Sequence, residues 1–326
     1  MINSGKPKQS CRKGVWRMTK VPEALASTIK QVHGEAGERW LAGFGELIAY
    51  CEERWGLKLL PSDYPLSFNY VAPAELPGGQ GAVLKLRVPE DPELPLETEA
   101  LRLFSGRGGA RLLDAVPERG ILVLARLAPG LTLKTVKDDL AAVRIAAGLL
   151  RSLRIPAPQG GPFPSTEQWA KGLGRLRSRH DGGTGPIPEE LVRRAEEGFE
   201  QLHRTMDKPL LLHGDLHHDN ILSDGTGWSA IDPKGVVGEL AYGAVPFLLN
   251  NLPDRDPEAA VRLIRTRVPL FAAELSVRSA RLVAWTFCHQ VLSAAWSLED
   301  GSGDIRTQVA QAWELLSLWR NDSFSV

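Results

Sequence analysis

One polar stretch, residues 213–220, most constrains the fold of this chain. It reads His-Gly-Asp-Leu-His-His-Asp-Asn and lies between two short apolar runs, residues 210–212 and 221–222. Such runs are typical of short buried strands on either side of a polar turn. The next residues, Ser-Asp-Gly-Thr-Gly at 223–227, indicate a hairpin. With 224–228 as its loop, Asn220 lies opposite Asp232. A slip of one residue would turn the two side chains to opposite faces.

Oxygen-bearing side chains gather at the open end of this predicted hairpin. Asp215 precedes Asn220 by five residues, and Asp232 follows on the second strand. Carboxylate and amide oxygens suit Mg²⁺, which proteins hold through one or two carboxylates together with substrate phosphates. The pattern therefore predicts a magnesium site on the hairpin.

Composition and length exclude several classes of protein. The chain has 326 residues, which favours two lobes over one core. Lysine and arginine together number 39, as do aspartate and glutamate, so net charge gives no argument for a nucleic-acid or membrane partner. No apolar run approaches the roughly 18 residues of a membrane span. The three cysteines, Cys11, Cys51 and Cys288, are too far apart for a zinc motif, and they indicate a reducing, cytoplasmic location.

The order of predicted elements indicates an α+β fold. Residues 1–17 are basic and contain no acid, so we expect a disordered tail, with Met18 as an alternative start. A helical pattern covers 21–55 with a break near 34–37, and the C-terminal part is mainly helical. We predict an N-terminal lobe over 18–127 and a C-terminal lobe over 128–326. The predicted strands, which form a five-stranded antiparallel sheet, are 57–60, 67–72, 82–88, 110–115 and 120–127. The predicted C-terminal helices are 135–153, 166–178, 188–204, 241–251, 256–274, 277–297 and 304–319.

Lys85 interrupts the third predicted strand, between apolar neighbours. Most lysines in strands face solvent, and a buried lysine needs a partner. The helix that begins near Pro95 carries Glu97 and Glu99, either of which can reach back to Lys85. Acids in a first helical turn also compensate the helix dipole, so they do not by themselves show a functional pair.

Three kinds of function fit these residues. In a kinase, Lys85 would grip nucleotide phosphates, Asn220 and Asp232 would hold Mg²⁺, and Asp215 would accept the proton of an attacking hydroxyl. A binuclear metallophosphoesterase would use the Gly-Asp-Leu-His run at 214–217, although it needs further His and Asn clusters that the chain lacks. A scaffold that binds nucleotide without turnover is the third.

The motifs resemble those of the aminoglycoside phosphotransferases, and more narrowly of the streptomycin 6-kinase and hydroxyurea phosphotransferase branch. The similarity rests on His-Gly-Asp-Leu-His-His-Asp-Asn at 213–220 and Ile-Asp-Pro-Lys-Gly-Val-Val-Gly at 231–238. Ala-Val-Leu-Lys-Leu at 82–86, Leu-Ala-Pro-Gly at 127–130 and Trp-Ser-Leu-Glu-Asp-Gly at 296–301 follow in the same order. It covers about residues 35–320.

The resemblance implies a protein-kinase-like fold that uses ATP and Mg²⁺. It assigns the catalytic base to Asp215, the metal ligands to Asn220 and Asp232, and the phosphate clamp to Lys85. The remaining implied roles are a helix partner for Lys85 at Glu97, adenine binding by the backbone from Ala125 to Leu127, and support of the loop by His213. His217 and His218 are interpreted as loop packing, because imidazole matches Mg²⁺ less well than oxygen does. The family pattern is broken at Gly243, where relatives tend to carry a carboxylate that anchors the loop.

The acceptor implied by the resemblance is an aminoglycoside, with streptomycin first, and hydroxyurea or another small hydroxylated metabolite as alternatives. Aminoglycosides are polycations, so an acidic cleft is expected. Glu299, Asp300 and Asp304 form an acidic cluster that fits this role, and an ordinary helix-end turn is the other interpretation. The sequence does not indicate an oligomeric state.

Overall fold

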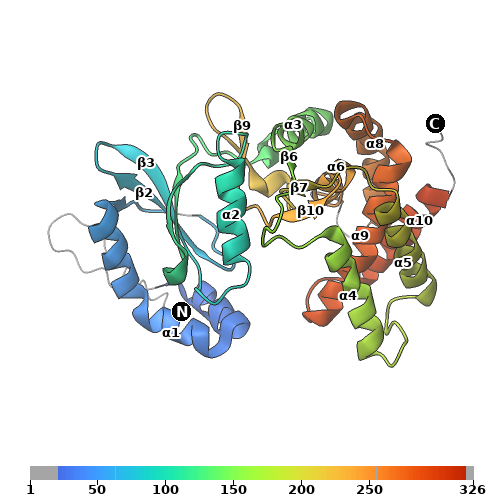
Figure 1. Ribbon diagram of the computed structural model, residues 1–326, viewed down its shortest axis with the longest axis horizontal. Coiled ribbons are helices and arrows are strands. Elements are labelled where there is room, and N and C mark those ends of the chain that lie inside the picture. The colour runs from blue at the N-terminus through green and yellow to red at the C-terminus, as the bar shows by residue number, and fades with distance from the viewer. Residues whose placement is uncertain (1–20, 63, 254–255, 321–326) are drawn as a thin grey trace, which may run out of the picture. The chain divides into compact units, whose positions relative to one another are not determined.

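The computed structural model describes residues 21–62, 64–253 and 256–320, so the predicted tail at 1–17 lies outside the described residues. The chain divides into two compact units (Figure 1). The first ends at Thr98 and also includes Leu112–Arg126, whereas the second holds Glu99–Arg111 and the chain from Leu127 onward. The predicted N-terminal lobe, 18–127, contains Glu99–Arg111, whereas these residues belong to the second compact unit. The division into lobes at 18–127 and 128–326 stays a prediction.

A single antiparallel sheet forms the centre of the first unit. Its strand order is β1-β2-β3-β5-β4, and every neighbouring pair is antiparallel, which confirms the predicted five-stranded sheet. A tight turn links β2 to β3, and the 3-10 turn η1 (Pro117–Arg119) links β4 to β5. The strands are β1 (Lys58–Leu59), β2 (Tyr70–Leu76), β3 (Gln80–Leu86), β4 (Leu112–Val116) and β5 (Ile121–Ala125).

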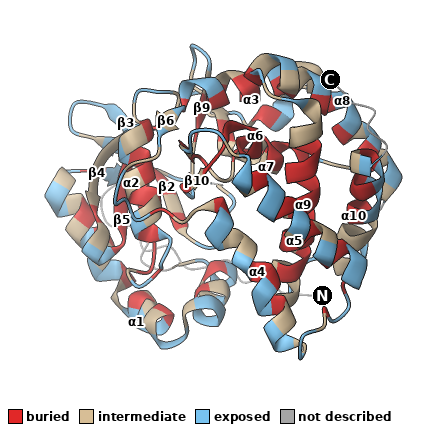
Figure 2. Cartoon of the chain, turned by 45° about the vertical axis from the view of Figure 1, so that its right-hand side comes forward, coloured by how far each residue is buried: buried red, intermediate tan, exposed pale blue. Residues whose placement is uncertain are grey.

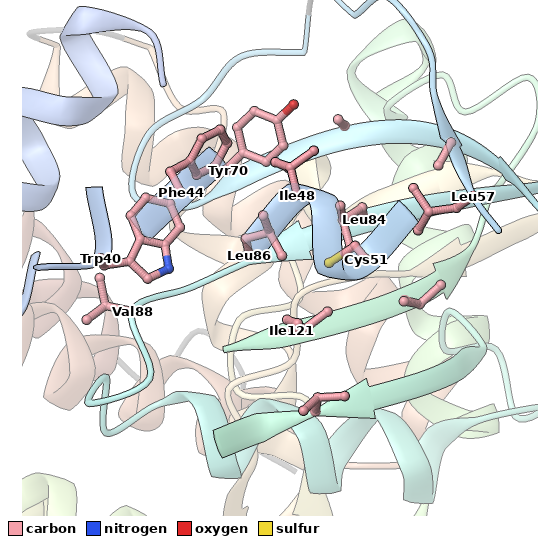
Figure 3. Close-up of a cluster of buried hydrophobic side chains, with 14 of the residues drawn as sticks. Trp40, Phe44, Ile48, Cys51, Leu57, Tyr70, Leu84, Leu86, Val88 and Ile121 are labelled. Atoms are coloured by element: carbon pink, nitrogen blue, oxygen red, sulfur yellow. The ribbon is translucent and has the colours of Figure 1, made fainter. Parts of the chain in front are cut away.

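The long helix α1 (Glu23–Trp55) covers one face of this sheet. Gly34 interrupts it with non-helical angles, φ 53° and ψ −130°, as the break in the sequence pattern predicted. Trp40, Phe44 and Ile48 recur at helical spacing and pack on the strands around Tyr70 (Figure 3). Burial of this apolar stripe holds the helix on the sheet.

Lys85 lies on the opposite face of β3 from this core. Its neighbours Leu84 and Leu86 are fully buried in the α1 cluster, and side chains alternate along a strand. Lys85 therefore points toward α2 (Leu94–Phe104), where it meets Glu97. The pairing with Glu97 that the family resemblance implied is confirmed.

The second unit is mainly helical. Its central element is α9 (Ser279–Glu299), which is buried over most of its length (Figure 2) and packs against α4, α5, α8 and α10. The stretch from Leu282 to Leu292 is mostly apolar and contains no Asp, Glu, Lys or Arg, which explains why this helix can be surrounded on all sides. The other helices are α3 (Asp139–Ser152), α4 (Thr166–Arg179), α5 (Glu189–Arg204), α6 (Leu240–Gly243), α7 (Val245–Leu248), α8 (Pro257–Leu275) and α10 (Ile305–Arg320), with 3-10 turns η2 (Leu133–Thr135) and η3 (His218–Asn220).

Two small sheets in the second unit carry the polar stretch. β7 (Leu210–Leu212) pairs with β6 (Ile155–Pro156) and β10 (Val236–Gly238), and β8 (Ile221–Ser223) pairs with β9 (Trp228–Ala230). The segment 213–220 thus begins at β7 and ends at β8, as predicted. No helix among the described residues is both long and apolar enough to cross a membrane.

The predicted register of the hairpin is wrong by one residue. Ser223 pairs with Trp228, and the amide of Ile231 donates to the carbonyl of Asn220, so Ile231 and not Asp232 lies opposite Asn220. The loop is shorter than expected because Asp224 closes it, its carboxylate accepting from the amides of Thr226 and Gly227. Asp232 follows the last paired residue and adopts a left-handed conformation with φ 57°.

Candidate active site

His213 ties together the two chain segments of the candidate site. Its Nε2–H donates to the carbonyl oxygen of Ile231 at 2.9 Å, and its Nδ1 accepts from the amide of Asp215 at 3.3 Å. These two bonds define one neutral tautomer. The ring is 2% exposed and stacks on Phe104, with 6.5 Å between ring centroids. His213 therefore fixes the backbone on both sides of the site, as its predicted supporting role requires.

Burial lowers the pKa of His213 to about 4, against the influence of Asp215 and the Ile231 carbonyl, which favour the charged form. The imidazole is consequently neutral at pH 7. A protonated ring would lose the lone pair that accepts the Asp215 amide. The geometry at Asp215 thus depends on a histidine that stays uncharged.

Asn220 is held by the same loop. Its side-chain Nδ2 donates to the backbone carbonyl of Asp215 at 2.9 Å, and its backbone N–H donates to the carbonyl of His217. This use of the amide nitrogen orients Oδ1 as the atom for a ligand. The 3-10 turn η3 is capped by His217, whose Nδ1 accepts from the amide of Asp219.

A second segment crosses beside the loop and carries Asp232. The amides of Lys234 and Gly235 both donate to the carbonyl of His213, at 2.9 and 3.0 Å. Asp232 directly follows Ile231, whose amide donates to the carbonyl of Asn220, so the backbone of Asp232 lies beside both Asn220 and His213. The structure therefore brings together Asp215, Asn220, Asp232 and His213.

Two nitrogen-bearing side chains adjoin Asp215. The Nζ atom of Lys234 lies 3.8 Å from Oδ2, and Nε2 of His217 lies 3.6 Å from Oδ1. The Asp215 side chain is 31% exposed, so the carboxylate is open to a ligand. Among the described residues, no group of three or more His, Cys, Asp and Glu side chains is arranged to hold a metal ion. A magnesium site here would instead combine Asn220 and Asp232 with phosphate oxygens.

The loop has a second support that the sequence did not reveal. His218 is buried, stacks on Phe247 with 4.0 Å between centroids, and shares a 2.9 Å hydrogen bond between Nδ1 and Oδ1 of Asn250. Arg267, which is fully buried, donates to the carbonyls of Phe247 and Asn250 and pairs with Asp139 at 2.7 Å. These contacts hold the loop from the side of α7 and α8.

Gly243, where the family pattern predicts a carboxylate, lies in the buried helix α6. A Cβ at this position would come within 3.0 Å of the Leu150 side chain. A larger residue here would require a small shift of the Leu150 side chain, so Gly243 is closely packed.

In the first unit, Lys85 belongs to a buried ion-pair network. Its Nζ lies 2.6 Å from Oε1 of Glu97, and both side chains are 3% exposed. Arg87 donates to the other oxygen of Glu97 and also pairs with Asp91 at 2.6 Å. Burial by itself lowers the pKa of Arg87, but Glu97 and Asp91 reverse this effect and raise it. Arg87 is a member of the network that sequence reasoning missed, although alternation within the predicted strand 82–88 places it on the same face as Lys85.

The predicted adenine site lies at the end of β5. Ala125 is the last residue of this strand and pairs with Ala82, and Leu127 is the residue at which the chain returns to the second unit. Glu99 accepts from Arg102 on the same helix. Nucleotide binding by the backbone of Ala125 and Leu127 stays a prediction.

The acidic cluster near the end of α9 is engaged within its own surroundings. Glu299 accepts from Arg175 at 3.2 Å, Asp300 caps α9, and Asp304 accepts from Thr307 at the start of α10. These contacts match the helix-end interpretation of the cluster. Acceptor binding by Glu299, Asp300 and Asp304 stays a prediction.

The fold is shared with known phosphotransferases. An aminoglycoside phosphotransferase solved in a ternary complex with ADP and hygromycin B superimposes with a TM-score of 0.58 at 16% identity, over 84% of this chain and 98% of that one. Together with the five-stranded sheet and the helical second unit, this confirms the predicted α+β, protein-kinase-like fold.

Sequence comparison defines the family. The model of the aminoglycoside/hydroxyurea antibiotic resistance kinases matches residues 67–301. A streptomycin 6-kinase of Streptomyces glaucescens is 30% identical over 302 residues, which are 88% of this chain and 93% of the relative. A hydroxyurea phosphotransferase of Kitasatospora aureofaciens is 32% identical over 301 residues, 88% of this chain and 83% of the relative. The chain belongs to the aminoglycoside/hydroxyurea antibiotic resistance kinase family.

The neutral state of His213 makes stability depend on pH. Its folded pKa of about 4 lies below the ordinary value of 6.5, so the unfolded chain binds the extra proton first as the pH falls. Stability is fully present above pH 6.5 and should fall by up to about 3 kcal/mol between pH 6.5 and 4. In urea titrations across this range, His213→Gln should show a shallower fall than the wild type. An equally steep fall in both proteins would contradict this origin.

Removing the shared carboxylate of the buried network should destabilise the protein strongly. Glu97→Gln leaves Lys85 and Arg87 buried beside a neutral amide. Removing one partner of a buried ion pair lowers the free energy of unfolding by about 3–5 kcal/mol. The matched control is Glu99→Gln on the same helix, where an exposed pair is lost and about 0.5 kcal/mol or less is expected. Urea denaturation gives both values, and similar losses for the two variants would refute the network.

Proposed function

We propose that this kinase transfers the γ-phosphate of ATP to a hydroxyl group of an aminoglycoside, with streptomycin as the first acceptor to test. The observation that carries the proposal is the assembly of Asp215, Asn220 and Asp232 around one neutral histidine. The 30% identity to a streptomycin 6-kinase over most of both chains supports the choice of acceptor.

The proposed roles follow from the chemistry of each side chain. Asp215 accepts the proton of the acceptor hydroxyl, because its backbone is held by His213 and Asn220 and its carboxylate is partly exposed. Asn220 and Asp232 hold Mg²⁺ through Oδ1 and a carboxylate, and the ion neutralises phosphate charge when bound. Lys85, fixed by Glu97, orients the nucleotide phosphates, and the backbone of Ala125 and Leu127 receives adenine.

Hydroxyurea is the second candidate acceptor. A hydroxyurea phosphotransferase is 32% identical to this chain, about as similar as the streptomycin kinase. Glu299 is already paired with Arg175, which reduces the negative charge available to bind a polycation at this position. The screen should therefore include hydroxyurea and small hydroxylated metabolites beside the aminoglycosides.

We place the enzyme in the cytoplasm, where ATP is abundant. The described cysteines, Cys51 and Cys288, are buried free thiols, in agreement with a reducing compartment.

The catalytic assignment is tested by Asp215→Asn. This variant keeps the shape of the side chain but cannot accept a proton, so transfer should fall by about 10²–10⁴-fold while ATP binding is kept. Phosphate transfer is measured with radiolabelled ATP and each acceptor, and nucleotide binding by calorimetry. Asp219→Asn is the control, because it makes the same change in the same loop at a carboxylate that pairs with Lys134.

Full transfer by Asp215→Asn would exclude Asp215 as the base. Absence of transfer by the wild type to every acceptor, with nucleotide still bound, would favour the non-catalytic scaffold.

The metal site is tested separately by Asp232→Ala. Loss of one of the two proposed oxygen ligands should remove the Mg²⁺ dependence of ATP binding, which calorimetry with and without Mg²⁺ detects. An unchanged Mg²⁺ dependence would contradict the role of Asp232.

A further inference from the structure

Lys234 supplies a cation directly beside the carboxylate of Asp215. Its Nζ lies 3.8 Å from Oδ2 of Asp215, and its side chain is 46% exposed. The residue follows the proposed metal ligand Asp232 by two positions. The roles proposed above use both aspartates but leave this lysine without a function.

The backbone under Lys234 is fixed more tightly than a surface lysine requires. Its own amide and that of Gly235 both donate to the carbonyl of His213. Gly235 has φ 68°, and a Cβ there would come within 2.5 Å of the Phe163 ring. The Cβ of Lys234 also lies 3.3 Å from the place where a side chain on Gly214 would begin. The chain therefore presents this side chain from a defined position.

The ion pair with Asp215 does not explain why the backbone of Lys234 is held so tightly. A distance of 3.8 Å is about 1 Å longer than a charge-assisted hydrogen bond. Both side chains are partly exposed, and such pairs contribute about 0–1 kcal/mol to stability. A fixed cation also does not help a carboxylate to accept a proton. The arrangement instead suits a negative charge that arrives beside Asp215.

Another lysine of the second unit is committed to a carboxylate of the loop. Lys134 pairs with Asp219 at 2.7 Å. Transfer of a phosphoryl group needs positive charge on its oxygens at the moment of transfer. Lys234 is long, half-exposed and able to move from Asp215 to such an oxygen.

We propose that Lys234 is a catalytic residue that contacts the transferring phosphoryl group, an inference that rests on the proposed function. The acceptor oxygen forms a bond to the γ-phosphorus, and the bond from that phosphorus to the bridging oxygen of ADP breaks. The hydroxyl proton passes to Asp215. Lys234 keeps its proton throughout and neutralises charge on the phosphoryl oxygens.

The test compares Lys234→Met and Lys234→Arg with a control, Lys208→Met, at an exposed lysine elsewhere in the second unit. In the full chain, Lys234→Met should lower kcat about 100-fold or more, the usual effect of removing one such donor. Lys234→Arg should restore part of the rate, and Lys208→Met should match the wild type. Because only ATP carries the γ-phosphate, Lys234→Met should weaken binding of ATP but not of ADP.

Two results would overturn this role. One is a Lys234→Met enzyme with wild-type kcat. The other is an equal loss of ATP and ADP binding, which would show a structural effect. Thermal melting checks that each variant is folded, and Lys234→Arg supplies the comparison if the methionine variant is not. A wild type that transfers no phosphate would overturn the proposed function itself, whereas an active wild type with an unaffected variant removes Lys234 alone.

Discussion

The candidate site depends on a buried, neutral imidazole. His213 uses both ring nitrogens, one toward the amide of Asp215 and one toward the carbonyl of Ile231, and its own carbonyl accepts from two amides of the opposite segment. One residue thus joins the loop that carries Asp215 to the segment that carries Asp232. Since phosphoryl transfer is mainly a matter of positioning and charge, a rigid link between base and metal ligand is the feature on which such a site would rest.

The surrounding helices explain how so short a loop stays fixed. The helix α9 fills the centre of the second unit, and Arg267 on α8 binds the carbonyls at the end of α7. Asn250, held by that arginine, orients His218 in the loop. In the first unit a comparable buried network fixes Lys85 through Glu97 and Arg87. In both units, buried charges are tolerated because each has a partner.

Much of this arrangement follows from local sequence patterns. The apolar runs around 213–220 predicted the two strands, the period of α1 predicted its buried stripe, and the break at Gly34 appeared where expected. The register of the hairpin was not predicted correctly, because the Asp224 side chain closes the loop one residue earlier than expected. The roles of Asn250 and Arg267 could not be predicted from the sequence either. Their roles depend on partners brought together only by tertiary packing, and nothing near them in sequence marks them as buried.

The most direct test of the account is the stereochemistry of transfer at phosphorus. If Asp215 acts as a base and the acceptor oxygen attacks in line, ATP made chiral at the γ-phosphorus with oxygen isotopes should give a product of inverted configuration. Analysis of the phosphorylated acceptor by ³¹P nuclear magnetic resonance would show this. Retention of configuration would mean two successive displacements through a phosphorylated residue, and would contradict the assignment of Asp215 as a base.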